Sequence, residues 1–203
     1  MSARLDAMSV EMPKVEKHPN RREFRGVLTL VGAPSDRAPS GAKGHRVILE
    51  ARAAEKALPT LIGMALDYAP QWDRHDARRK IGIITSAELN SAPCKRMVSA
   101  SVANPSSVKK VRAQAAGASI QLNAPAGGHQ LEVQGYLFAH DFPEIVAEIQ
   151  AGVGKLGMSY EIADVHVLDT KAPIWLATEF TFTGAAVLRR DKAAYASTWV
   201  ELA

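Results

Sequence analysis

Residues 130–162 have the sequence QLEVQGYLFAHDFPEIVAEIQAGVGKLGMSYEI, in which two strand patterns flank a helix pattern. Residues 130–139 alternate between polar and apolar side chains, as a half-buried strand does. Residues 141–152 start with a candidate Asp cap and an early Pro and finish on a Gly, which predicts a helix. Residues 155–169 then favour one bent strand or a pair of strands.

Outward from this segment, the chain adds more strands than helices. Further strand patterns occupy residues 23–33, 45–51, 81–89 and 174–188, the last of which runs from a strand into a loop. Residues 51–66 favour a short helix that breaks at Pro59. About six or seven strands and one or two helices, without a βαβ rhythm, predict an antiparallel α+β fold with a closed or nearly closed sheet.

The chain of 203 residues, 47% of them hydrophobic, suits one domain with a core of its own. Residues 1–22 are predicted to be a flexible leader, and residues 196–203 a tail. Residues 23–195 then form the domain. Within it, residues 90–128 are rich in Ala, Ser, Pro and Gly, which predicts a loop or insertion.

Charge and cysteine content favour a soluble protein that binds neither membranes nor a specific nucleic acid. The net charge is only +4, and the densest basic cluster is interrupted by acidic residues and lacks interleaved aromatics. We find no apolar run of about 18 residues and no secretory signal at the N-terminus. The single cysteine, Cys94, cannot form an internal disulfide, which favours a reducing, cytoplasmic setting.

Motifs for metals and nucleotides are missing from the sequence. It contains no CxxC, no HExxH and no close His pair on one helix face, so no metal site is expected. Gly152, Gly154 and Gly157 have the GxGxxG spacing, but they follow a helix and precede a strand. A dinucleotide site needs the reverse order, so no cofactor is expected either.

Nucleophilic catalysis is the remaining chemistry, and it needs a serine, a base and a group that orients the base. Ser159 follows a Gly-rich turn at the start of a strand, although without further context this pattern favours an ordinary strand serine. Of the six histidines, His75 lies just before a strand and His166 lies between two valines. Composition does not choose between these two bases.

A resemblance to a known family favours His75 over His166 as the base. The stretches that carry it are GVLTLVGAPSDRAPSGAKGHRVIL, DRHDARRKIGIIT, LEVQGYLFAHDFPEIVAEIQAGVGKLGMSYEI and TEFTFTGAAVL with RDKAAY. A His shortly before an Ile-Gly, then a helix–Gly–Leu–x–Ser segment and a closing strand occur in this order. From about Phe24 to Tyr195, the chain thus resembles the prohead serine proteases of tailed bacteriophages.

The resemblance implies a herpesvirus-protease-like fold, an antiparallel closed or nearly closed β-barrel with a few surrounding helices. The nucleophile of the family falls on Ser159 and the base on His75. Glu179 is the closest match for the third triad member, where the herpesvirus pattern has a histidine; His166 and Asp164 are alternatives. The triad is thus Ser-His-acid or Ser-His-His.

Two glycines are candidates for the oxyanion region, where backbone amides stabilise the tetrahedral intermediate. Gly157 lies close to Ser159 in the sequence, and Gly184 follows the strand that carries Glu179.

The resemblance further implies a serine endopeptidase that processes scaffold or major capsid proteins, and itself, during prohead maturation. Residues 1–22 and the tail after Tyr195 are the expected self-cleavage segments. The expected location is the assembling prohead in the bacterial cytoplasm. Because the herpesvirus enzymes work as dimers, a homo-oligomer is one expected state of this chain. The alternative is a non-catalytic structural or scaffold-binding head protein with the same fold.

Overall fold

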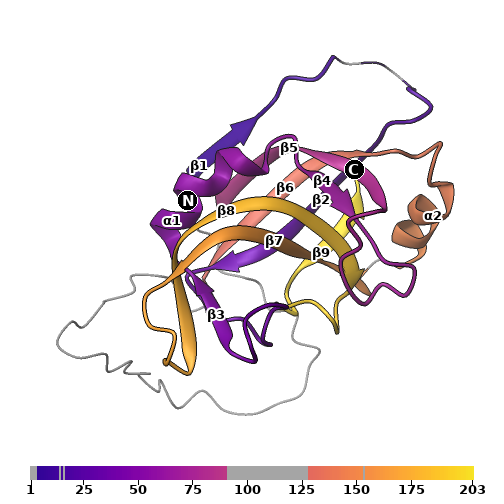
Figure 1. The fold of residues 1–203 in the computed structure, drawn as a ribbon. Helices are drawn as coiled ribbons and strands as arrows, with labels where there is room; N and C mark the ends of the chain where they lie inside the picture. Colours follow the sequence, from indigo (N-terminus) through magenta and orange to yellow (C-terminus); the bar gives the residue numbers. More distant parts are fainter. Residues whose placement is uncertain (1–3, 14, 16, 91–127, 153) are drawn as a thin grey trace, which may run out of the picture.

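The structure is a computed structural model, and it describes residues 4–13, 15, 17–90, 128–152 and 154–203 (Figure 1). The predicted loop or insertion at 90–128 therefore lies almost entirely outside the described residues. The fold is mostly β, with 46% strand and 13% helix.

Nine strands and three short helical segments make up the described chain. They are β1 (Arg4–Ser9), β2 (Arg22–Val31), β3 (Arg46–Leu49), α1 (Ala51–Ala57), η1 (Leu58–Leu61), β4 (Ala65–Asp67), β5 (Lys80–Asn90), β6 (His129–Leu137), α2 (Pro143–Ala151), β7 (Leu156–Val167), β8 (Ile174–Arg189) and β9 (Trp199–Leu202). The short helix predicted to break at Pro59 is confirmed, because α1 passes into the 3-10 turn η1 there.

All nine strands belong to one sheet in the order β3-β8-β4-β5-β6-β2-β9, with β1 added to β5 and β7 added to β8. The pairs β3–β8 and β4–β8 are parallel, and the others are antiparallel. The sheet curls strongly around the core, as the arched β7 and β8 show in Figure 1.

The predicted fold class is wrong, because the sheet is an open, strongly curled half-barrel rather than a closed or nearly closed barrel with surrounding helices. In the described part of the chain, no strand pairing joins β7 to β9 across the seam. A side-chain bond lies there instead, from the Met158 amide to the Thr198 hydroxyl at 3.2 Å. Closure depends on strand tilt and stagger, which a count of strands does not contain.

Bulges and glycines produce the curl. Register shifts interrupt the pairing at Val27/Thr29, at Ile84/Ser86 and at three places along β7 and β8; such bulges increase strand twist. Gly135 lies so close to the Ile83 carbonyl of the next strand that a Cβ there would collide with it. Only glycine permits this approach, which bends β5 and β6 together.

Several segments take more regular structure than their sequences indicate. β8 is one strand of 16 residues, where a strand followed by a loop is predicted. β1 lies within the predicted leader and pairs with β5, and β9 lies within the predicted tail and pairs with β2. None of the helices in the described ranges has the length and apolar character that a bilayer crossing requires.

Candidate functional site

A pocket of about 1060 Å³ opens between β7, β8 and two loops. Its walls come from residues 39–43, from the loop that carries His75, and from both strands. Ser159 and His75, which are far apart in the sequence, both line it. The tertiary structure therefore brings the predicted nucleophile and the predicted base to one cavity.

β7 places Ser159 in this pocket by strand alternation. Met158 and Tyr160 are 1% and 8% exposed and belong to the core. Side chains at alternate positions of a strand point to opposite faces, so Ser159 and Glu161 both face the pocket. The candidate nucleophile and a carboxylate are thus two residues apart on one strand face.

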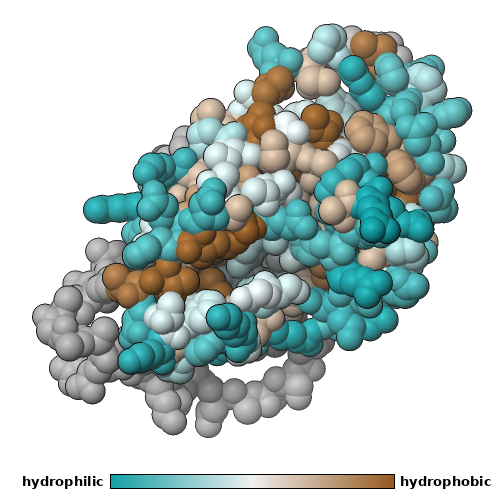
Figure 2. Space-filling model, viewed as in Figure 1, coloured by the Kyte–Doolittle hydropathy of each residue, from teal (hydrophilic) through white to brown (hydrophobic). Residues whose placement is uncertain are grey.

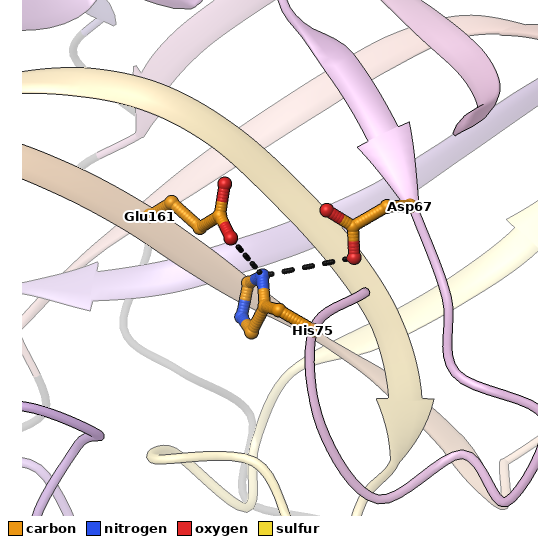
Figure 3. Close-up of side chains that lie close together, drawn as sticks. All are labelled: Asp67, His75 and Glu161. Carbon is orange, nitrogen blue, oxygen red and sulfur yellow. Dashed lines mark ion pairs between the residues drawn. The ribbon is translucent and has the colours of Figure 1, made fainter. Parts of the chain in front are cut away.

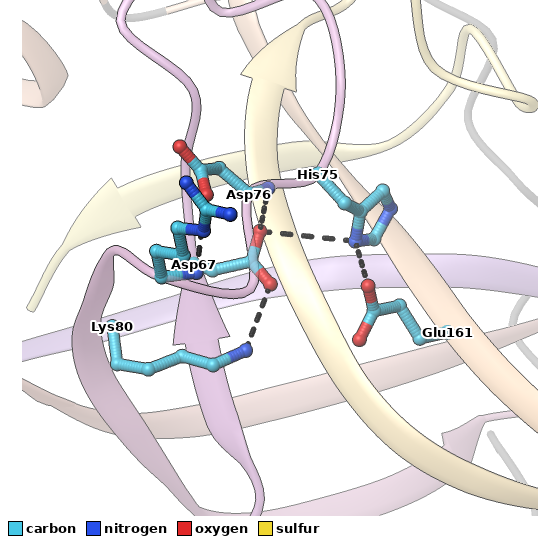
Figure 4. A network of polar contacts seen from close by, with 6 residues as sticks. Asp67, His75, Asp76, Lys80 and Glu161 are labelled. Carbon is cyan, nitrogen blue, oxygen red and sulfur yellow. Dashed lines mark hydrogen bonds and ion pairs between the residues drawn. The ribbon is translucent and has the colours of Figure 1, made fainter.

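His75 lies in the loop between β4 and β5, and this loop is held at several points (Figure 4). Asp67, the last residue of β4, accepts a hydrogen bond from the Asp76 amide at 3.1 Å. The Trp72 carbonyl accepts one from the Arg189 amide, at the end of β8, at 2.7 Å. These bonds fix the backbone on both sides of His75.

Two carboxylates converge on Nδ1 of His75 (Figure 3). A Glu161 oxygen lies 3.1 Å from it, and an Asp67 oxygen lies 3.8 Å from it. Nδ1 is buried, and the described residues offer it no partner in hydrogen-bonding alignment. An imidazole between carboxylates is oriented by them and is stabilised by them once it gains a proton.

Asp67 is the buried anchor of this group, with its side chain fully shielded from solvent. Lys80 lies against its other oxygen, with Nζ 3.1 Å from Oδ2 (Figure 4). A buried carboxylate needs such partners because water no longer solvates its charge. The Lys80 charge and the Asp76 amide together satisfy Asp67 and leave the Oδ1 side facing His75.

The far end of the pocket is apolar. Ile162, Val165 and Val167 of β7 line it, and Val165 is 43% exposed. Trp175 of β8 lines the same region and stacks on His45, with ring centroids 4.6 Å apart. Figure 2 shows hydrophobic side chains gathered over β7 and β8 on this face of the molecule. Such a surface suits an apolar side chain of a bound chain or ligand.

The sequence candidates for the third triad member lie elsewhere. Glu179 pairs with His166 in the β7–β8 register, and its carboxylate lies 3.9 Å from Lys56. His166 Nδ1 contacts the Thr178 hydroxyl at 3.0 Å, and Asp164 occupies the intervening bulge with φ of 54°. At about 3.3 Å per strand residue, His166 lies up to about 23 Å along β7 from Ser159.

Gly157 and Gly184, the candidate oxyanion residues, both have packing roles. A Cβ on Gly157 would lie 2.6 Å from the Thr198 hydroxyl. A Cβ on Gly184 would lie 2.7 Å from a carboxylate oxygen of Glu161. Gly184 thus provides the space in which the Glu161 carboxylate turns toward His75.

Sequence reasoning missed Asp67 and Glu161. The signal for Glu161 is present, because a residue two positions after a strand serine shares its face. Asp67 ends a short apolar strand, and no local pattern connects it to His75. Its role depends on the fold of the loop between them.

Comparison with known proteins adds no family to these observations: no family model matches the chain, and neither a curated protein nor a solved structure matches it.

Proposed function

We propose that this chain is a serine endopeptidase, with Ser159 as the nucleophile and His75 as the general base. The observation that carries the proposal is that both residues line one pocket, while two carboxylates face Nδ1 of His75. That arrangement leaves Nε2 as the nitrogen available to a serine hydroxyl. The order of sequence motifs that resembles the prohead proteases supports the same two residues.

In the proposed reaction, Nε2 of His75 accepts the hydroxyl proton of Ser159 as Oγ attacks the substrate carbonyl carbon. The tetrahedral intermediate then breaks its C–N bond, and His75 returns the proton to the leaving amine. Water, activated by the same nitrogen, hydrolyses the acyl-enzyme ester and regenerates Ser159.

Asp67 and Glu161 are the proposed positioning residues and take the place that the resemblance gives to Glu179. Both face Nδ1, where an acid holds the imidazole in one tautomer and stabilises the imidazolium. Glu161 is closer, and Asp67 is better shielded from solvent, so the two carboxylates share this role.

The proposed substrates are scaffold and major capsid proteins in the assembling prohead of a tailed phage, inside the bacterial host, with trimming of the chain's own ends. The apolar end of the pocket suits a peptide with an apolar side chain near the cleaved bond. The competing function is a non-catalytic head protein that binds scaffold through the same surface.

The test is labelling with a fluorophosphonate, which reacts only with an activated serine, followed by mass spectrometry. We expect the adduct on Ser159 in the wild type. The adduct should be absent in Ser159→Ala, and its rate of formation should fall by a factor on the order of 10⁴ in His75→Ala. Thr183→Ala removes another hydroxyl from the same pocket and should label normally.

Co-expression with scaffold and capsid proteins tests the substrate class. Wild type and Thr183→Ala should trim these proteins, whereas Ser159→Ala should leave them at full length. Equal trimming by Ser159→Ala, or labelling that survives in it, would contradict the proposal. Absence of labelling and trimming in every variant would favour the non-catalytic head protein.

A further inference from the structure

Three side chains at the pocket wall have the composition of a metal site. Asp67, His75 and Glu161 each direct one ligand atom inward, and these three atoms all lie within 4.8 Å of one another (Figure 3). Carboxylate oxygen and imidazole nitrogen are ligands that Zn²⁺ accepts at about 2.0–2.2 Å. Sequence motifs indicate no metal, because the three residues come from β4, a loop and β7.

The spacing of these atoms matches the space that a small cation needs. Two ligands at about 2.05 Å from a tetrahedral zinc are roughly 3.3 Å apart. Nδ1 of His75 lies 3.1 Å from the Glu161 oxygen and 3.8 Å from the Asp67 oxygen. The three ligand atoms all lie within 4.8 Å of one another, so adjustment of the Asp67 and Glu161 side chains would place them around one ion.

The Nδ1 atom of His75 supplies a second observation at this cluster. This atom is buried, yet it forms no hydrogen bond with the described residues, although both carboxylates are near. A buried polar atom without a partner in line is unusual and calls for an explanation. A cation between Nδ1 and the carboxylates would give Nδ1 a partner and would bind both carboxylates through lone pairs that remain free.

The charge at the site also favours a divalent cation. Asp67 and Glu161 contribute two negative charges, and Lys80 contacts only Oδ2 of Asp67. The Oδ1 atom that faces His75 accepts one amide hydrogen and retains a second lone pair. The pocket beside Glu161 leaves room for water or another ligand at the open coordination position.

We propose that Asp67, His75 and Glu161 bind Zn²⁺, and that bound zinc holds the serine peptidase inactive. A neutral imidazole whose Nδ1 binds a metal carries its one proton on Nε2. Nε2 then has no lone pair to accept the Ser159 proton. Zinc binding does not depend on the proposed function, whereas inhibition of the peptidase by zinc rests on it.

The binding test uses the full chain with Cys94→Ser in every variant, so that the single cysteine does not compete for zinc. Calorimetric titration with Zn²⁺, and the visible absorption of Co²⁺ as its substitute, should both report one site. Glu161→Gln keeps the side-chain shape but weakens one ligand, so affinity should fall by about tenfold or more.

Two matched controls define the site. Glu179→Gln alters an exposed carboxylate on β8 and should leave zinc affinity unchanged. Ser159→Ala abolishes the proposed catalysis but should retain zinc binding. Wild-type affinity in Glu161→Gln, or no binding in the parent chain, would overturn the metal site.

Inhibition is measured by fluorophosphonate labelling with Zn²⁺ and again after a chelator. Labelling should be blocked by zinc and restored on its removal, and Glu161→Gln should need about tenfold more zinc or above for the same block. Full labelling of the zinc-saturated protein would overturn the inhibitory role and leave the peptidase proposal intact. Zinc binding in a chain that never labels would instead refute the peptidase and the inhibition together.

Discussion

Tyr160, the residue after the proposed nucleophile, has a hydroxyl that is buried without a hydrogen-bond partner among the described residues. Its ring packs edge-on against Phe182, with centroids 6.3 Å apart. Burial raises the pKa of Tyr160 well above the ordinary tyrosine value, because the phenolate would lose its solvation. The side chain therefore anchors β7 in the core as a neutral group.

This pKa shift predicts a loss of stability in alkali. A raised folded-state pKa means that its stabilising contribution is complete below about pH 10 and declines as the pH rises above that value. The unfolding free energy of Tyr160→Phe should decline less than that of the wild type between pH 9 and 11. At pH 7 it should equal the wild-type value or exceed it by up to about 1 kcal/mol. Urea denaturation across this pH range measures both effects.

The control for this prediction is Tyr136→Phe, which changes a partly exposed tyrosine on β6. Its alkaline decline should follow that of the wild type. Tyr195, whose pKa burial also raises, remains in both variants, so the decline should shrink in Tyr160→Phe rather than vanish. Identical curves for Tyr160→Phe and the wild type would contradict the argument.

At the scale of elements, the β7–β8 pair organises the candidate site. Its register sets Glu161 opposite Gly184 and Ser159 opposite Ala186. Small residues on β8 leave space above the sheet, and the Glu161 carboxylate occupies it beside His75. Gly184 is therefore a positioning residue that acts through Glu161.

Gly184→Ala should slow the chemistry while it spares the fold. The new Cβ would lie 2.7 Å from Oε2 of Glu161, so this carboxylate must shift from the position in which Oε1 faces His75. We expect the fluorophosphonate labelling rate to fall by about tenfold, with stability within about 1 kcal/mol of the wild type. Labelling kinetics and urea denaturation measure the two quantities.

A second substitution separates positioning from general damage. If Gly184 acts through Glu161, adding Gly184→Ala to Glu161→Gln should slow labelling little beyond Glu161→Gln alone. Thr183→Ala, at the neighbouring position of β8, serves as the control. A Gly184→Ala protein that labels like the wild type would exclude this role for the glycine.

Some helices and strands could be predicted from the sequence, and others could not. The helix α2 and the strand β6 were predictable, because an early Pro, a terminal Gly and alternation are local signals. The predicted cap was wrong, since the residue at the N-cap is Phe142 and not Asp141. β8 was not, since its final residues, which resemble a loop, are held by β7 on one side and β4 on the other. Neighbouring strands supply the hydrogen bonds that the local pattern does not indicate.

At the scale of the whole molecule, Thr198 makes a hydrogen bond across the seam of the half-barrel. Its buried hydroxyl accepts the Met158 amide hydrogen and donates to the Tyr195 carbonyl at 3.0 Å. One side chain therefore links β7, at the residue before Ser159, to the turn that leads into β9. This link keeps the open edge of the sheet and the candidate nucleophile in place.

Thr198→Val should weaken the seam. Valine matches the shape of threonine but leaves the Met158 amide without its acceptor, which should cost about 1–3 kcal/mol of unfolding free energy. Hydrogen exchange should also accelerate at the Met158 amide. Thr85→Val, which removes an exposed hydroxyl from β5, should cost no more than about 0.5 kcal/mol. Equal costs for the two variants would exclude a special role for the seam.

Some residues of the candidate site could be predicted from the sequence, whereas others depend on contacts that only the folded chain makes. Ser159 and His75 were proposed from the order of sequence motifs, and the pocket contains both. Glu161 follows from strand alternation once Ser159 is placed on β7. Asp67 does not follow from any spacing, because the loop after β4 must first fold back to carry His75 toward it.

The helix α2 and most of the strands are encoded in short windows of residues, where periodicity acts, and the order of motifs along the chain led to the proposal of Ser159 and His75. The open half-barrel, the seam at Thr198 and the carboxylates around His75 arise from contacts between residues far apart in the chain. Such contacts depend on bulges, register and sheet curvature, which are properties of the packed sheet and not of any single segment.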